Sequence, residues 1–121
     1  MRSEVIFLNE KKITAGEVIA VVDGLKPNAY GIEDKIRWLD DINGQIMKRV
    51  HKLQYKAVTG QTDELYVSVP FDSIYRYYLF AMIDFHNEET ELYVNDWAMF
   101  QSTLKEYENQ FTEGGQIKNY W

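Results

Sequence analysis

Large apolar side chains near the carboxyl end of the chain recur at spacings that alternate between four and three residues. They are Tyr93, Trp97, Phe100, Leu104, Tyr107 and Phe111. This spacing puts one bulky side chain on the same side of each helical turn and predicts a long helix that ends before Gly114. The same spacing also suits a partner helix from another chain. The pattern therefore leaves open whether the stripe packs within one chain or between chains.

Two helices are predicted in the first half of the chain. The segment Thr14 to Glu17 carries the residues of a capping box, so the first helix should run from Ala15 to Gly24. Its buried positions are Val18, Ile19, Val22 and, less firmly placed, Leu25. A second apolar stripe extends from Ile32 to Val50 and predicts a helix of about five turns. Gly44 lies within this stripe and indicates a close helix contact or a mild kink.

A loop composition separates the second helix from a third. Residues 53–64 are rich in loop formers, and Leu65 to Val69 alternates as a short extended segment does. Pro70 suits the first position of the next helix, with Asp72 as an alternative cap, and the helix should end near His86. Its expected buried face contains Ile74, Tyr77 or Tyr78, Ala81, Met82 and Phe85, with Tyr75 and Leu79 on the flank.

These elements predict an all-α fold, a small bundle of about four helices with a long loop or short extended segment between the second and third. We expect an N-terminal arm over residues 1–13, a helical domain over 14–112 and a flexible tail over 113–121. The 121 residues are enough for one core. The side chains expected in it are Trp38, Leu39, Ile46, Ile74, Met82, Phe85, Trp97, Phe100 and Leu104.

Charge is distributed unevenly along the chain. The net charge is −6, yet residues 84–113 hold eight acidic side chains against Lys105 alone. An acidic helix repels phosphate, which argues against a protein that grips DNA. Glu106 and Glu108 should therefore either face solvent or line a passage through which DNA slides without sticking.

Composition also limits the chemistry. The absence of cysteine excludes disulfides and thiolate metal sites. Val5 to Leu8 is too short an apolar run for a signal peptide or a membrane span, so we expect a cytoplasmic site of synthesis and no membrane association. We expect no catalytic residue, no metal and no cofactor. Asp40 and Asp41 point about 100° apart on a helix and do not converge on one proton.

One cluster of polar residues could carry chemistry. It lies at the junction of the third and fourth predicted helices and consists of Asp84, His86, Glu88 and Glu89. Oxygen and imidazole ligands can bind a divalent ion. A solvated junction, in which acidic side chains cap the next helix, is the favoured interpretation.

Several fragments in order resemble a known family. The most extended are Leu25-Lys26-Pro27-Asn28-Ala29-Tyr30, Lys35-Ile36-Arg37-Trp38-Leu39, Ile42-Asn43-Gly44-Gln45-Ile46, Val67-Ser68-Val69-Pro70-Phe71-Asp72-Ser73-Ile74-Tyr75 and Ala81-Met82-Ile83-Asp84-Phe85. Together they resemble the small helical head-tail connector proteins, also called adaptor or head completion proteins, of long-tailed bacteriophages and prophages. The resemblance covers about residues 14–112.

The resemblance implies a helical bundle that forms a ring under the portal protein, commonly of twelve copies, with DNA passing through its centre without sequence-specific binding. It also implies a stopper or tail-completion protein as the next partner, and a final location at the head-tail interface of the virion after synthesis in the host bacterial cytoplasm. Residues then expected to contact the portal or a neighbouring subunit are Gln54, Tyr55, Gln61, Tyr66, Tyr120 and Trp121. The rival hypothesis is a small helical regulator or inhibitor that forms no ring.

Overall fold

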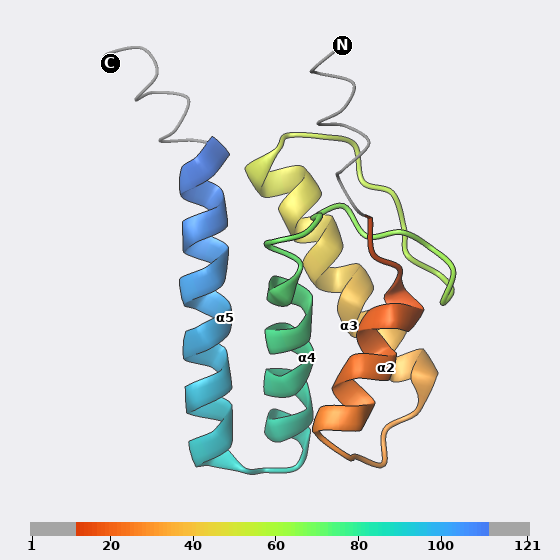
Figure 1. The fold of residues 1–121 in the computed structure, drawn as a ribbon, viewed down its shortest axis with the longest axis vertical. Coiled ribbons are helices and arrows are strands. Elements are labelled where there is room, and N and C mark those ends of the chain that lie inside the picture. Colours follow the sequence, from red (N-terminus) through yellow and green to blue (C-terminus); the bar gives the residue numbers. More distant parts are fainter. Residues whose placement is uncertain (1–11, 112–121) are drawn as a thin grey trace.

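Four α-helices and one π-helical turn make up the fold in a computed structural model, which describes residues 12–111 (Figure 1). In chain order they are α2 (Ala15–Leu25), α3 (Ile32–Gln45), the π-helical turn η1 (Ile46–Val50), α4 (Ser73–His86) and α5 (Thr90–Phe111). Within the described range there is no β-strand, only one isolated antiparallel bridge between Thr14 and Glu64. The predicted all-α bundle is confirmed.

Helix α2 begins with the predicted capping box. The Thr14 hydroxyl accepts a hydrogen bond from the Glu17 amide at 3.2 Å, and the Glu17 carboxylate accepts one from the Thr14 amide at 2.9 Å. Both bonds satisfy amides that the first helical turn would otherwise leave without partners. The apolar face of α2 is buried, but Leu25, at its last position, is 65% exposed.

Helix α3 passes directly into η1, so the predicted long second helix is present with a widened last turn. The hydrogen bond from the His51 amide to the Ile46 carbonyl, at 3.3 Å, spans five residues. Gly44 does make a close contact, but with the ring of Tyr55 in the following loop instead of another helix. A β-carbon at position 44 would lie 2.6 Å from the Tyr55 ring. Gly44 therefore makes room for an aromatic side chain.

This contact predicts that Gly44→Ala has a different effect on stability with and without the Tyr55 ring. Alanine stabilises a helix interior by about 1 kcal/mol relative to glycine. In a Tyr55→Ala background, Gly44→Ala should therefore raise the free energy of unfolding by about that amount. In the otherwise unchanged chain the gain should vanish, because the new methyl group displaces the Tyr55 ring. Urea denaturation of the four variants measures the difference, and an equal gain in both backgrounds would show that the ring does not restrict position 44.

Helix α4 occupies the middle of the bundle and packs against α2, α3 and α5 (Figure 1). Its buried residues are Ile74, Tyr75, Leu79, Ala81, Ile83 and Asp84. The prediction was wrong for Phe85, whose side chain is 58% exposed in the last turn, and Met82 is only partly buried. Tyr75 and Leu79, expected on the flank, are fully buried. A helix with neighbours on several sides buries more than one stripe, so a single-stripe pattern misplaces its faces.

The start of α4 also differs from the first expectation. Pro70 lies in a turn, in which the Phe71 amide donates to the Ser68 carbonyl at 3.0 Å, and the helix begins at Ser73. The alternative cap Asp72 does occupy the residue before the helix, although its side chain makes no capping hydrogen bond. Turn residues 69–72 thus separate the loop from α4.

Helix α5 runs antiparallel to α4 at one edge of the bundle (Figure 1). Phe100 of its aromatic stripe is buried, and Trp97 and Leu104 pack against the core while partly exposed. Ile74 of α4 is buried in the same core, as are Trp38 and Leu39 of α3 and Ile46 of η1. The stripe of α5 thus packs within the chain along its described length.

The loop between η1 and α4 is fastened to α3 by two side chains. One carboxylate oxygen of Asp40 accepts hydrogen bonds from the Tyr55 hydroxyl and from the Val58 amide, the latter at 2.8 Å. Asn43 Oδ1 accepts from the Tyr66 amide at 2.9 Å and from the Tyr75 hydroxyl at 2.6 Å. These bonds hold the end of the loop over the core, where Leu65 and Val67 are buried.

Candidate interaction surfaces

Three of the residues expected to contact other subunits, Tyr55, Gln61 and Tyr66, contact different parts of the fold. Tyr55 is 41% exposed on the surface of α3. Gln61 lies at the start of α2, where its carbonyl accepts a hydrogen bond from the Gly16 amide at 2.8 Å. Tyr66 is half-buried beside His51, with 4.8 Å between ring centres. Gln54 is exposed, and Tyr120 and Trp121 fall outside the described residues.

The two glutamates expected on an acidic face point in different directions. Two residues apart on an α-helix, they project about 160° from each other. Glu106 is exposed, whereas Glu108 is half-buried and borders a groove between η1 and α5. Arg49 lines the same groove. Glu106 and Glu108 therefore lie on nearly opposite sides of α5.

An aromatic contact connects the end of η1 to α5. His51 Nε2 lies 2.5 Å from the Tyr107 hydroxyl, and the Tyr107 ring also meets Phe71 at 5.5 Å between centres. Burial lowers the pKa of His51 below its usual value. These contacts join the end of η1 to α5, at the end of the bundle opposite the turn between α4 and α5.

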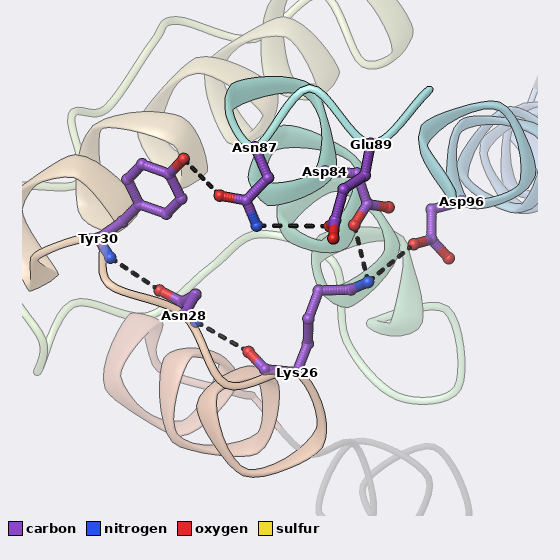
Figure 2. A network of polar contacts seen from close by, with 7 residues as sticks. All are labelled: Lys26, Asn28, Tyr30, Asp84, Asn87, Glu89 and Asp96. Atoms are coloured by element: carbon purple, nitrogen blue, oxygen red, sulfur yellow. Dashed lines mark hydrogen bonds and ion pairs between the residues drawn. The ribbon is translucent and has the colours of Figure 1, made fainter. Parts of the chain in front are cut away.

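A network of charged side chains joins α2, α4 and α5. Figure 2 shows Lys26, the residue that follows α2, reaching Asp84 on α4 and Asp96 on α5. Its ammonium lies 2.7 Å from Asp84 Oδ1 and 3.5 Å from Asp96 Oδ2. Asp84 is fully buried. The Lys26 ammonium thus pairs with one carboxylate of α4 and one of α5, the two helices that pack most extensively against each other.

The second oxygen of Asp84 has no hydrogen-bond donor within reach among the described residues. Burial and the neighbouring Asp96 carboxyl together raise the pKa of Asp84 to about 6, against the opposing effect of Lys26. Burial alone would lower the pKa of Lys26, but the bond to Asp84 and the charge of Asp96 outweigh it and raise that pKa. The pair of carboxyls is therefore positioned to share a proton.

A second chain of hydrogen bonds runs beside this network (Figure 2). Asn28 donates to the Lys26 carbonyl at 2.9 Å and accepts from the Tyr30 amide at 3.1 Å. The Tyr30 hydroxyl donates to Asn87 at 2.7 Å, and Asn87 donates to Glu89 at 3.5 Å. The connection between α2 and α3 is thereby tied to the turn between α4 and α5.

This turn borders a pocket of about 720 Å³. The side chains and backbone that line it are those of Asp84, Phe85, His86, Glu88, Glu89, Thr90 and Tyr93. Four of them are the acidic and histidine cluster that the sequence offers as a possible metal site. Within residues 12–111, however, no three His, Cys, Asp or Glu side chains are grouped so that they could hold a metal ion.

Lys26, Asp96 and Asn43 are among the residues of these networks that the sequence pattern does not single out. Asp96 offers a signal, because it lies three residues after Tyr93 and four before Phe100, on the flank of the aromatic stripe. Lys26 and Asn43 offer none, since their partners are 58 and at least 23 residues away in the sequence.

Comparison with other proteins adds no relative to this picture. Searches against protein-family models, curated proteins and solved structures find no match. No helix in the described portion of the chain is both long and apolar enough to cross a membrane.

Proposed function

We propose that this protein is a structural head-tail connector of a tailed bacteriophage or prophage. Its copies would dock as a ring, of about twelve subunits by family resemblance, under the portal protein. The ring would extend the DNA channel and be joined in turn by a stopper or tail-completion protein in the virion. The ordered sequence fragments described above and the small helical bundle support the proposal.

The observation that carries the proposal is the position of α5 at the edge of the bundle. Its 22 residues span about 33 Å, and only the side that faces α4 is extensively packed. Among the residues on the remaining surface, Leu92, Val94 and Met99 are 46–57% exposed. A long helix with apolar side chains on its outer surface suits contact with a neighbouring subunit, since burying them removes apolar area from water.

The described residues also fit a role in which DNA passes without being held. The carboxyl-terminal third is strongly acidic, and its acidic side chains lie on several sides of α5. Repulsion of phosphate would keep DNA from adhering to the channel wall. The contact with DNA would then carry no sequence preference.

The proposal is tested by the mass of the assembly. The purified chain, of 14.3 kDa, would be measured by light scattering alone and after mixing with candidate portal proteins, followed by negative-stain imaging. A collar of many copies on the portal is the expected result. A stable one-to-one complex with some other partner would support the helical regulator instead.

Substitutions on α5 sharpen this test. Leu92 and Met99 are seven residues apart and share one side of the helix, each 46% exposed. Replacing both by glutamate should leave the fold intact, because both positions are exposed. It should reduce the assembly to monomers, because two negative charges would then have to be buried in the apolar contact between subunits. Ser102→Glu, an added charge on another exposed position of α5, is the matched control. Rings that form equally well with Leu92→Glu/Met99→Glu would remove this side of α5 from the interface.

A further inference from the structure

The groove between η1 and α5 continues along the end of α3. Both α3 and α5 pack against α4, and in the described part of the chain they have no extensive contact with each other. Val50 on one wall and Trp97 and Leu104 on the other are apolar and only partly buried. Tyr78 of α4 also lines the groove, whose volume is about 260 Å³. The groove therefore leaves apolar surface in contact with water that a further helix could cover.

The opposite side of α5 carries an outer stripe that consists of Leu92, Met99 and Glu106. These three residues are exposed and lie seven residues apart, so they project from one side of the helix. Met99 lies two residues after Trp97 and five before Leu104, and it therefore projects about 140–160° away from both. Each copy thus presents a groove and an outer stripe on nearly opposite sides of the same helix.

A ring of more than two copies needs two different surfaces that complement each other, because every subunit meets one neighbour on each side. If the ring axis runs parallel to the helices, the α5 helices of neighbouring copies are parallel and at the same height. Met99 of one copy then lies at a height between Trp97 and Leu104 of the next. Glu106 lies at the height of the groove end, which Arg49 borders.

The charges at this end of the groove suit the same pairing. Arg49 is exposed, and within the described residues neither Arg49 nor Glu106 belongs to an ion pair. Residues 42–62 contain no acidic side chain and four exposed cationic ones, Lys48, Arg49, Lys52 and Lys56. Among the residues that line the groove, Glu108 is the one carboxylate. The groove end is therefore positive overall and would attract Glu106 of a second copy.

We infer that the groove of one copy receives the outer stripe of α5 from a second copy. Met99 packs against Trp97 and Leu104, and Glu106 pairs with Arg49. The contact repeats in one direction from copy to copy and closes into a ring where the rotation between copies allows it. The inference rests on the ring of the proposed function and adds the surface that receives α5, although the contact itself requires no portal protein.

Disulfide cross-linking tests the contact directly, because the chain contains no cysteine. Met99→Cys combined with Gln101→Cys places one thiol on the outer stripe and one at the groove. The two side chains project from nearly opposite sides of α5, so no disulfide can form between them within one copy. Mild oxidation of the purified protein should give a ladder of covalent oligomers on a denaturing gel. Met99→Cys alone should remain monomeric.

Met99→Cys combined with Val21→Cys is the matched control, since Val21 is similarly exposed but lies on α2. An equal ladder from this pair would reveal random collision and overturn the inference, as would the absence of a ladder from the first pair. The same gels separate the inference from the connector function. A ladder from a protein that forms no collar on the portal would support this contact without the connector. A collar in which the first pair forms no cross-link would support the connector without this contact.

Charge reversal tests the end of the groove. Arg49→Glu and Glu106→Arg should each weaken self-association about tenfold, and the double variant should recover most of the loss because the ion pair is restored with its signs exchanged. Lys56→Glu makes the same change of charge at an exposed position that does not line the groove, so it should have little effect. Analytical ultracentrifugation measures the association. Equal weakening by Lys56→Glu, or no recovery in the double variant, would refute the pairing of Arg49 with Glu106.

Discussion

Replacing Asn43 with alanine should lower the free energy of unfolding by about 3 kcal/mol. Asn43 is buried, and its side-chain oxygen accepts hydrogen bonds from the Tyr66 amide and the Tyr75 hydroxyl. The Tyr75 hydroxyl in turn accepts from the Val67 amide at 2.9 Å. Alanine would leave two buried donors without their acceptor, and each such loss costs about 1–3 kcal/mol. Urea denaturation measures the change.

Tyr75→Phe provides the control for this network. Alone it removes the hydroxyl shared by Asn43 and Val67, so it should also destabilise the protein. Because both substitutions disrupt the same bond, the double variant should cost at least about 1 kcal/mol less than the sum of the single costs. Strict additivity would show that Asn43 and Tyr75 act independently. Faster hydrogen exchange at Val67 in both single variants would further locate the effect in the loop.

Replacing Lys26 with methionine should lower the free energy of unfolding by about 2 kcal/mol at pH 7 and by much less at pH 5. The lysine is the partner of a buried carboxylate, and removing it leaves the charges of Asp84 and Asp96 uncompensated. The figure is set below that of a fully buried pair because the Lys26 side chain is 21% exposed to solvent. At lower pH one carboxyl takes up a proton, so that one uncompensated charge remains in place of two.

The direction of this pH dependence follows from the pKa of Asp84. Folding raises that pKa from 3.8 to about 6. The folded protein therefore binds the proton more tightly, and the stability this contributes is complete below pH 3.8 and is lost as the pH rises through about 6. Without Lys26 the folded-state pKa should rise further, so the Lys26→Met protein should lose more stability over a wider range. Urea denaturation of both proteins between pH 4 and pH 8 follows the difference.

Asp84→Asn is the matched variant for this test. In the Lys26→Met background it should restore much of the lost stability at pH 7 and flatten the pH dependence, since asparagine has no charge to bury and titrates nowhere in this range. If Lys26→Met loses equal stability at pH 5 and pH 7, the loss comes from packing of the lysine stem and not from charge. The contact between the Lys26 ammonium and the Phe80 ring, 5.6 Å from its centre, would be the first place to look.

Local signals in the sequence were sufficient for the order and type of the helices. The capping box at Thr14 involves residues three apart, and the aromatic stripe of α5 faces a single neighbour, so both are readable from spacing alone. Helix α4 was harder because it has neighbours on several sides. Its exposed Phe85 and buried Asp84 are set by where the bundle ends and where Lys26 lies, and neither is encoded in the periodicity of α4.

The pocket was predicted only in part. The cluster of Asp84, His86, Glu88 and Glu89 is visible in the sequence because its members are close together along the chain. Its geometry depends on the conformation of Glu88 and on Tyr93 one turn into the next helix, so spacing could not separate a metal site from a pocket with aromatic walls. The predicted contact residue Tyr55 also has a role within the fold, because its ring packs against Gly44 and its hydroxyl donates to Asp40.

The widened turn η1 bears on how the length of this chain can change during evolution. A π-helical turn holds one residue more than the α-helical turn it replaces. Deleting one exposed residue there, such as Lys48, would let the helix continue as an ordinary α-helix. The residues that follow would keep their phase, and His51 would stay beside Tyr107. Relatives that lack one residue at this position would therefore keep both the helix and the side chains through which it meets α5.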